Sequence, residues 1–341
     1  MMNDIGRAPA QTLDETRSLV LPALHKAVDR LDDLERLTTS YHLGWVDAGG
    51  NPVSGAGGKA VRPALAVLGA RAVGAEPAVA VPGAVAVELV HNFSLVHDDI
   101  MDRDRTRRHR PTVWSVWDEA TAILTGDAML SLAHEVLLEE GGLQAAAASW
   151  HLARCTRALI NGQVLDMTFE QRAEVSLHEC RRMAQGKTAA LIATSTVIGA
   201  VLAGGDADAL DALTTYGLRI GLAFQLVDDL LGVWGDPQVT GKSNFSDLQA
   251  KKKTLPVCWA LGQDGARAAR LRAWFTDGPT DPAALARAAG LLEEAGARDW
   301  AEGEARRLVA SAQAALRGAA LTPSATADLH AMADFIAGRK A

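Results

Sequence analysis

Apolar residues recur at helical spacing along most of the chain. In the segment 14–37 they fall on one side of a helix, at Leu21, Leu24, Val28, Leu31, Leu34 and Leu37. Pro82 opens a strongly apolar helix that is expected to run to about Arg103, and similar patterns cover 143–171 and 206–234. No segment has the convincing apolar–polar alternation of a strand. The pattern therefore predicts an all-α fold, a single-domain bundle of ten or more helices.

Breaks in this pattern mark the expected loops of the domain, which is taken to cover residues 1–341. Residues 1–13 lack a helical pattern and are expected to be disordered. The stretch 40–57 is rich in glycine and is expected to form a mobile loop. Ser176 is expected to begin another helix, because Glu179 three residues later completes a capping box.

The composition favours a helical protein and argues against nucleic-acid binding. Hydrophobic residues make up 48% of the chain and aromatic residues only 5%, a mixture that favours helix over strand. The formal net charge of −7 argues against general nucleic-acid binding. The basic residues gather in local clusters, so the expected anion is small.

No feature of the sequence indicates export or a membrane span. Residues 1–13 have no apolar core behind a basic start, so no signal peptide is expected. The most apolar run, 189–205, is short for a membrane span and is interpreted as a buried helix. The cysteines lack metal-ligand spacing and are expected to be buried apolar thiols, at Cys155, Cys180 and Cys258. A cytoplasmic protein is expected.

The densest chemistry lies where the helix that begins near Pro82 ends. Three carboxylates fall within five residues, at Asp98, Asp99 and Asp102, and a basic run follows, with Arg105, Arg107, Arg108 and Arg110. If the helix continues through this cluster, Asp98 and Asp102 lie one turn apart on the same face. Two carboxylates in that geometry repel each other unless a cation lies between them. The cluster therefore indicates a site for a hard divalent metal ion and a polyanion.

A second acidic pair, Asp228-Asp229, ends another apolar helix. An unpaired carboxylate pair is costly to bury at an apolar helix end, whereas carboxylates that face each other across a bundle can form a multi-metal site. Oxygen ligands without a His or Cys cluster favour Mg²⁺, which commonly shares its coordination sphere with substrate phosphates. The alternative, two solvated helix ends, fits less well with two pairs that each follow an apolar helix. The expected ligand is a phosphorylated small molecule.

Three motifs resemble those of the trans-isoprenyl diphosphate synthase (polyprenyl synthetase) family. The stretch Leu95 to Thr112, LVHDDIMDRDRTRRHRPT, is similar to the family's first aspartate-rich motif, and Phe224 to Gly235, FQLVDDLLGVWG, is similar to the second. The segment Gly57 to Pro63, GGKAVRP, resembles the family's early Gly-Gly-Lys-x-x-Arg-Pro signature. The resemblance covers about Gly57 to Pro256, and it implies the isoprenoid-synthase fold, in which helices surround a central cavity.

The resemblance also implies a reaction and a metal cofactor. The family condenses isopentenyl diphosphate with an allylic diphosphate, such as the dimethylallyl, geranyl or farnesyl compound. By resemblance, Asp98 and Asp102 are ligands of two Mg²⁺ ions on the allylic diphosphate, with Asp99 supporting them. Asp228, with its neighbour Asp229, corresponds to the ligands of a third ion. Mn²⁺ is an alternative to Mg²⁺.

The remaining carried-over residues concern the two diphosphates. Lys59, Arg62 and His91 correspond to the metal-free pocket for isopentenyl diphosphate. Arg107 resembles the contact to the allylic diphosphate and Arg108 the contact to the isopentenyl one. The residues that match family positions near the reacting carbon or over the diphosphate are Lys187, Thr188, Gln225, Lys242 and Lys252. The last assignment could slip by one, because 251–253 are all lysine.

One departure concerns the second aspartate-rich motif. Gly232 stands where the family often has a third aspartate. Asp228, the expected direct ligand, is retained, so we expect metal binding to be retained as well.

Product length is expected to depend on the helix that leads into Asp98. Val90, Phe93 and Ser94 are expected to form the floor of an apolar tunnel for the growing chain. In the family, bulky residues at both the fourth and fifth positions before the motif tend to stop growth at fifteen carbons, and an aromatic residue at the fifth alone tends to give twenty. Phe93 with Ser94 matches the second pattern, so geranylgeranyl diphosphate is expected, with farnesyl diphosphate as the alternative.

Two other functions compete with this interpretation. A class I terpene cyclase also uses aspartate-rich helices and Mg²⁺, but it needs no second diphosphate pocket. A non-catalytic subunit of a heteromeric synthase typically loses aspartates that this sequence keeps. The resemblance further implies a homodimer formed through an apolar helix face.

Overall fold

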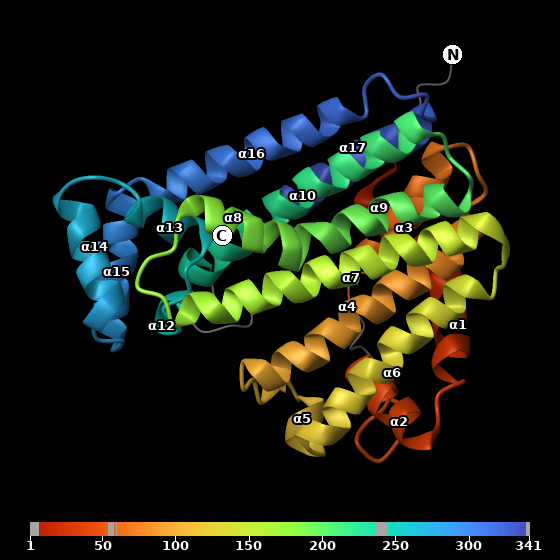
Figure 1. The fold of residues 1–341 in the computed structure, drawn as a ribbon, viewed down its shortest axis with the longest axis horizontal. Helices are drawn as coiled ribbons and strands as arrows, with labels where there is room; N and C mark the ends of the chain where they lie inside the picture. Colours follow the sequence, from red (N-terminus) through yellow and green to blue (C-terminus); the bar gives the residue numbers. More distant parts are fainter. Residues whose placement is uncertain (1–6, 54–57, 59, 236–244, 339–341) are drawn as a thin grey trace. The chain divides into compact units, whose positions relative to one another are not determined.

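The computed structural model describes residues 7–53, 58, 60–235 and 245–338. Over these residues the chain is mostly helical with almost no sheet, which confirms the predicted all-α class (Figure 1). The chain divides into two compact units. Unit 1 comprises Met1–Thr156, Thr194–Thr214 and Gly318–Ala331, and unit 2 comprises Arg157–Ala193, Thr215–Arg317 and Met332–Ala341.

Unit 1 contains the N-terminal helices and the first aspartate-rich motif. Its complete helices are α1 (Pro9–Val28), α2 (Asp33–His42), α3 (Val61–Ala72), the 3₁₀ turn η1 (Pro77–Ala80), α4 (Val81–Met101), α5 (Val113–Val116) and α6 (Glu119–Leu138). Four further helices have residues in both units, namely α7 (Gly142–Glu170), α9 (Ala190–Leu202), α10 (Ala207–Trp234) and α17 (Pro323–Ala337).

Helix α4 forms the middle of unit 1. It packs along α6 and also against α1 and α3, and Figure 1 shows α4 and α6 side by side. Pro82 lies in its first turn, where a missing backbone N–H costs nothing. Its body is buried, with Val85, Leu89 and Val96 at most 1% exposed. This packing fixes the C-terminal end of α4, where the aspartates lie.

Glycines allow α3 and α9 to approach backbone to backbone within unit 1. A Cβ atom on Gly69 would lie 2.1 Å from the carbonyl oxygen of Thr196, and one on Gly199 would lie 2.0 Å from that of Ala66. No real side chain tolerates such distances. The two glycines therefore set how closely these helices pack.

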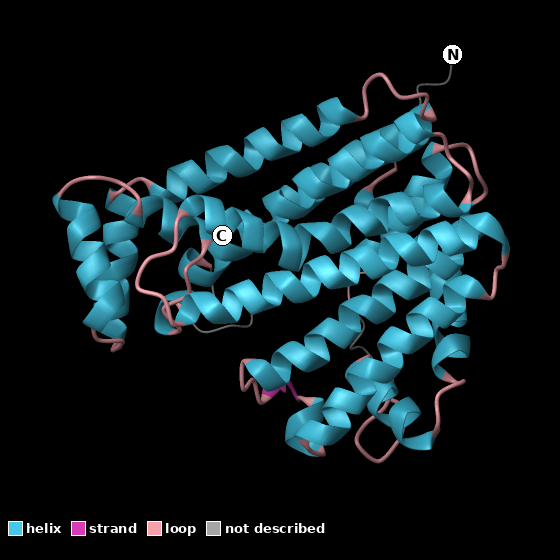
Figure 2. Cartoon of the chain, in the orientation of Figure 1, coloured by secondary structure: helices cyan, strands magenta, loops and turns pink. Residues whose placement is uncertain are grey.

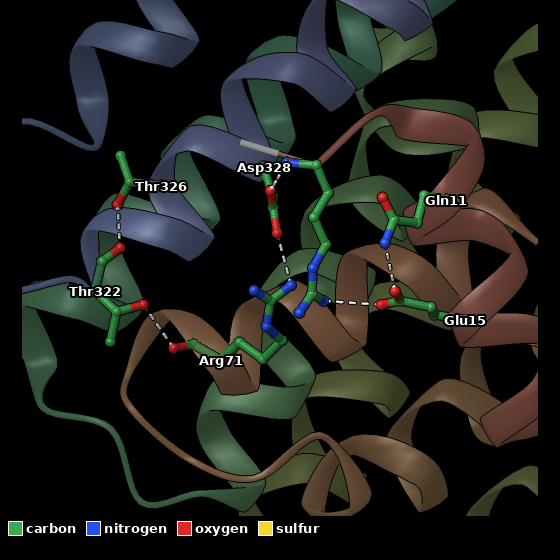
Figure 3. Close-up of polar contacts among 7 residues, drawn as sticks. Gln11, Glu15, Arg71, Thr322, Thr326 and Asp328 are labelled. Atoms are coloured by element: carbon green, nitrogen blue, oxygen red, sulfur yellow. Dashed lines mark hydrogen bonds and ion pairs between the residues drawn. The ribbon is translucent and has the colours of Figure 1, made fainter. Parts of the chain in front are cut away.

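Asp328 ties the start of α17 to the rest of unit 1. Its carboxylate accepts hydrogen bonds from the backbone N–H of Arg7 at 2.6 Å and from Nη1 of Arg71 at 2.7 Å (Figure 3). The Asp328 side chain is only 1% exposed. Thr322 adds a hydrogen bond from its hydroxyl to the carbonyl oxygen of Arg71. Residues far apart in sequence thus meet at one buried charge pair.

Unit 2 has its own hydrophobic core. Its complete elements are α8 (Leu177–Ala184), the π-helical turn η2 (Gln185–Ala189), α12 (Ser246–Gln249), α13 (Leu255–Leu261), α14 (Ala266–Asp277), α15 (Pro282–Glu294) and α16 (Ala297–Ala315). The core side chains include Val233, Leu248, Val257, Leu271 and Leu292. Helix α8 begins with the predicted capping box of Ser176 and Glu179, which is confirmed.

Some expectations about loops need correction. Residues 9–13, which were expected to be disordered, form the first turns of α1. The segment expected as one helix over 14–37 divides between α1 and α2. Within the stretch 40–57, residues 40–42 complete α2, and Val46 and Pro52 form an isolated antiparallel bridge. Residues 54–57 lie outside the described part of the chain.

The expectation that the chain contains no strand is also wrong, because the structure has one small hairpin. Strands β1 (Thr106–Arg107) and β2 (Arg110–Pro111) pair antiparallel directly after α4 and appear in magenta in Figure 2. Each strand has two residues, too few for period-two alternation to appear in the sequence. The hairpin matters because it carries the arginines of the first motif.

Within the described part of the chain, two segments are long and apolar enough to cross a membrane by length and composition, Pro77–Met101 and Glu119–Leu138. The core helices of water-soluble folds pass the same test, and 61% of the first window is buried within the protein. The test is therefore weak evidence of a membrane span. As predicted, the three cysteines are buried.

Candidate functional site

The first acidic cluster occupies the last turn of α4, as the sequence predicts. The backbone N–H of Asp102 donates to the carbonyl oxygen of Asp98 at 2.8 Å, so the two residues are one helical turn apart on the same face. Asp98 is half-buried and Asp102 is exposed, whereas Asp99 is 1% exposed. The cluster therefore presents two carboxylates outward and one inward.

Arg107 holds the inward carboxylate. Its Nε and Nη2 atoms lie 2.8 Å and 2.7 Å from Oδ1 of Asp99. Burial raises the pKa of Asp99 above its ordinary value, and the hydrogen bonds and charge of Arg107 oppose that rise. Asp99 thus fixes the orientation of Arg107, the arginine predicted to contact the allylic diphosphate.

The hairpin after α4 places the arginines of the first motif in different environments. Arg108 and His109 form its two-residue loop, and both have positive φ angles, of 50° and 61°, as a type I′ turn requires. Arg110 is used structurally, because its guanidinium donates to the carbonyl oxygens of Tyr41 and Val46 and lies over the Tyr41 ring. The Arg108 side chain lies near Gly58, whose Cβ position would lie 3.5 Å from Nη2 of Arg108.

Three of the residues predicted for the second anion pocket meet in unit 1. The pKa of His91 lies well below its ordinary value because of burial, and because the positive charges of Arg62 and Arg108 lie close to it. His91 is therefore a neutral imidazole near two guanidinium groups. Burial also lowers the pKa of Arg108. Lys59, the fourth predicted member, lies outside the described residues.

His42 is a member of this region that the sequence analysis missed. It ends α2, and burial, together with the positive charges of Arg107, Arg108 and Arg110, lowers its pKa to about 3. It lines a small cavity with Asp99 and the three arginines. No motif marks His42, because it is a single residue of an otherwise ordinary amphipathic helix.

The residues predicted to control chain length lie on the buried part of α4. Val90, Phe93 and Ser94 are 0%, 5% and 8% exposed. The Phe93 ring meets the His97 ring edge to face, with 5.1 Å between centroids. The Ser94 hydroxyl donates to the carbonyl oxygen of His91 at 2.8 Å.

In unit 2 the predicted Lys-Thr pair lies in the π-helical turn η2. Lys187 Nζ donates to Asp166 of α7 at 2.6 Å, and the Thr188 hydroxyl donates to the side chain of Gln225 on α10. π-helical turns are rare and occur frequently at functional sites. The structure thus brings together three residues that the resemblance assigns to the reacting carbon, and joins Asp166 to them.

The second acidic pair splits into two environments within unit 2. Asp228 is half-buried. Asp229 is 4% exposed, and its carboxylate accepts from Gln225 Nε2 at 2.7 Å and from the backbone N–H of Leu255 at 2.9 Å. Burial raises the pKa of Asp229 to about 7. Asp229 thus satisfies the N-terminus of α13, and Asp228 is the member of the pair that is not buried.

Another acidic residue occupies the space left by Gly232. A Cβ atom on Gly232 would lie 2.0 Å from Oδ2 of Asp247, which belongs to α12 of the same unit. A carboxylate from a different element therefore lies beside the position where the second motif lacks its third aspartate. Lys252 is half-buried in the segment after α12, and its backbone N–H donates to the carbonyl oxygen of Asp247. Lys242 lies outside the described residues.

The donors at the end of α4 are compatible with Mg²⁺. They are hard carboxylate oxygens, which Mg²⁺ prefers. Among the described residues, no group of three His, Cys, Asp or Glu side chains converges closely enough to hold an ion alone. Mg²⁺ commonly completes its octahedron with waters and substrate phosphates. Asp98 and Asp102 would serve such an ion as partial ligands.

Comparisons with known proteins agree with this geometry. The family model for polyprenyl synthetase matches residues 45–292. A protein from Mycobacterium tuberculosis (strain ATCC 25618 / H37Rv) described as (2E,6E)-farnesyl diphosphate synthase is 50% identical over 98% of this chain and 94% of its own length. A geranylgeranyl diphosphate synthase from the same strain is 40% identical over 99% of this chain and 95% of its own length.

Solved structures have the same fold. A polyprenyl synthetase from Streptomyces coelicolor A3(2) matches with a TM-score of 0.91 and 50% identity, over 96% of this chain and 98% of that one. A geranylgeranyl pyrophosphate synthetase from Pyrococcus horikoshii Ot3 matches with a TM-score of 0.86 and 30% identity, over 97% of this chain and 98% of the other. With its aspartate-rich α4, the adjoining arginines and these matches, the chain belongs to the polyprenyl synthetase family and is a prenyltransferase.

Proposed function

We propose that the protein condenses isopentenyl diphosphate with an allylic diphosphate in a Mg²⁺-dependent reaction and releases an all-trans short-chain prenyl diphosphate. The observation that carries this proposal is the presence of two cationic groupings in unit 1. Arg107 forms an ion pair with Asp99 at the end of α4, while the positive charges of Arg62 and Arg108 both act on His91. An enzyme that binds two diphosphates needs two cationic binding sites, whereas a cyclase that acts on one diphosphate needs only one.

The chemistry of the proposed allylic diphosphate site follows from its charges. Ionisation of an allylic diphosphate builds negative charge on the departing pyrophosphate, and preorganised cations stabilise that charge. Arg107, held by Asp99, supplies one such cation. When bound by Asp98 and Asp102, Mg²⁺ would supply further charge neutralisation. We further propose that three ions bind and that Asp228 is a ligand of the third.

The proposed isopentenyl diphosphate site holds the nucleophilic substrate in position. The double bond of isopentenyl diphosphate attacks the allylic carbocation, so no protein nucleophile is needed, but the two partners must be close and aligned. Arg62 and Arg108 would bind the diphosphate by charge, and the neutral His91 would bind it by hydrogen bonding. Lys187, Thr188 and Gln225 are proposed to line the reacting carbon.

Two observations favour different product lengths. The small Ser94 next to Phe93 favours geranylgeranyl diphosphate, the C20 product, by the family pattern. The relative at 50% identity is described as a farnesyl diphosphate synthase, which favours the C15 product. We propose geranylgeranyl diphosphate as the main product and farnesyl diphosphate as the second candidate.

Product analysis tests the proposal. Purified protein is given isopentenyl diphosphate, Mg²⁺ and in turn dimethylallyl, geranyl and farnesyl diphosphate, and the chain lengths are measured. A C20 product from the farnesyl primer supports the proposal. A C15 product alone selects the second candidate, and products of thirty carbons or more contradict both.

The assembly is proposed to be a cytoplasmic homodimer. Unit 1 exposes large apolar side chains on α6 and at the start of α7, namely Ile123, Leu124, Leu138, Leu143 and Trp150. Exposed apolar side chains gathered on neighbouring elements are typical of association surfaces. Activity of the purified chain by itself would exclude the alternative of a non-catalytic subunit, and its mass in solution would test the dimer.

A further inference from the structure

A small pocket lies next to the first aspartate-rich motif. It has a volume of about 20 Å³, and its lining includes His42, Asp99, Arg107, Arg108 and Arg110. A cavity of about 10–15 Å³ on this measure holds one water molecule, provided that it offers at least two polar partners. The space is thus large enough for one water.

Two polar atoms of this lining are buried and have no hydrogen-bond partner among the described residues, His42 Nε2 and Asp99 Oδ2. Oδ1 of Asp99 is already held by Arg107. A buried polar atom without a partner costs about 1–3 kcal/mol, so native proteins usually satisfy it with protein or water.

The chemistry of His42 decides what can satisfy both atoms. The side chain of Asn92 hydrogen-bonds to His42, while Nδ2 of Asn92 donates to the backbone oxygen of Glu88. The Asn92 oxygen is therefore the atom that faces the imidazole, and it accepts from Nδ1–H. In the neutral ring this tautomer leaves Nε2 as an acceptor.

Two acceptors, one imidazole nitrogen and one carboxylate oxygen, then line the same space. Neither can donate to the other while Asp99 is ionised. One water molecule can donate one hydrogen to each, which satisfies both atoms at once. An ammonium or metal ion would also face two acceptors, but the three surrounding arginines disfavour a cation.

We propose that His42 is a positioning residue of the allylic diphosphate site, and that it acts through one water bound between its Nε2 and Oδ2 of Asp99. The water fixes the rotation of the Asp99 carboxylate, so that Oδ1 stays aligned with Nε and Nη2 of Arg107. Asn92 sets the required tautomer of His42. The functional part of this inference rests on the proposed two-substrate reaction, whereas the water site does not.

Matched substitutions at residue 42 separate this role from simple packing. His42→Asn keeps a group near Nδ1 but removes the atom at Nε2. His42→Gln reaches the Nε2 position with an amide that can hydrogen-bond to the water or to Asp99 directly. Thr39→Val on the same helix changes a buried hydroxyl that is not part of the cavity lining and serves as the control for α2.

Steady-state kinetics with both substrates give the first readout. For His42→Asn we expect KM for the allylic diphosphate to rise about tenfold, the effect of losing one hydrogen bond to a buried charged group, with KM for isopentenyl diphosphate nearly unchanged. His42→Gln should restore most of the loss, and Thr39→Val should match the wild type. Equal rises in both KM values, or no difference between the two His42 variants, would overturn the proposal.

A high-resolution crystal structure of the wild-type protein gives a second readout that needs no activity. Density for one water within hydrogen-bond distance of His42 Nε2 and Asp99 Oδ2 supports the proposal, and its absence from the His42→Asn structure strengthens it. A cavity without such a water, or direct contact between the two side chains, overturns it. Lack of condensation by the wild-type protein would contradict the proposed function and leave this structural test intact.

Discussion

At the scale of single residues, the site depends on how each carboxylate is held. Asp99 and Asp229 both follow another aspartate and both are buried, but they have different partners. Asp99 binds Arg107, whereas Asp229 binds Gln225 and the N-terminus of α13. In each pair the preceding aspartate is the more exposed member. Each buried aspartate therefore supports a neighbouring element of its unit.

Replacement of Arg107 by lysine tests the support given by Asp99. Lysine cannot reproduce the two nitrogens that Arg107 places on Oδ1. We expect kcat/KM for the allylic diphosphate to fall about ten- to hundredfold, as for the loss of one or two charge-assisted hydrogen bonds. Arg105→Lys is the matched control, since Arg105 is exposed and lies over the Trp114 ring. Wild-type kinetics for Arg107→Lys would contradict this role.

At the scale of elements, the π-helical turn η2 positions Lys187 and Thr188. It is held by a close approach to α7, where a Cβ atom on Gly162 would lie 2.2 Å from the backbone nitrogen of Lys187. The sequence predicts helices on both sides of η2, but it cannot predict the π-helical turn. That turn depends on a contact between Gly162 and Gly186, which are distant in sequence, and periodicity reports only local burial.

Substitution of Gly162 by alanine tests this close approach. The added methyl group has no room, so we expect the turn to shift, with a loss of about 1–3 kcal/mol of stability from overpacking and a clear loss of kcat. Gly290→Ala in α15 is the control, because no atom lies within 4 Å of its Cβ position. That change should be neutral or slightly stabilising. Thermal unfolding and kinetics of both variants measure the difference.

The capping box of α8 predicts a pH dependence of stability. Hydrogen bonds from Arg172 and Ser176 lower the pKa of Glu179 to about 2, from an ordinary 4.5. Its contribution to stability is therefore complete above about pH 4.5 and is lost as pH falls toward 2. Glu179→Gln should lower the melting temperature at neutral pH, and the difference from the wild type should shrink on acidification. A constant difference across this range would exclude the charge of Glu179 as its cause.

At the scale of the whole molecule, the sequence predicts the helical class and the family's motifs, but not the long-range contacts that organise them. Asp328 looks like an ordinary helical residue until its contacts with Arg7 and Arg71 are known. His42 likewise becomes part of the site only through the packing of α2 against α5 and α6. Motif residues are recognisable from spacing, whereas supporting residues are defined by tertiary contacts.

Substitution of Asp328 by alanine tests the buried charge pair. It would leave the Arg71 guanidinium and the Arg7 backbone N–H without this partner, and breaking a buried pair typically costs about 3–5 kcal/mol. Denaturant unfolding should report a loss of that order. Glu294→Ala, which removes an exposed ion pair with Arg267, should cost less than about 1 kcal/mol. Similar losses in the two variants would contradict a special role for Asp328.

The most direct test of the two-diphosphate site is the dependence of pyrophosphate release on both substrates. Purified protein is given geranyl diphosphate and Mg²⁺, and pyrophosphate is measured with and without isopentenyl diphosphate. We expect release to require isopentenyl diphosphate and to match the amount of elongated product. Rapid release from geranyl diphosphate alone, with a hydrocarbon or alcohol as product, would contradict the synthase and indicate a cyclase.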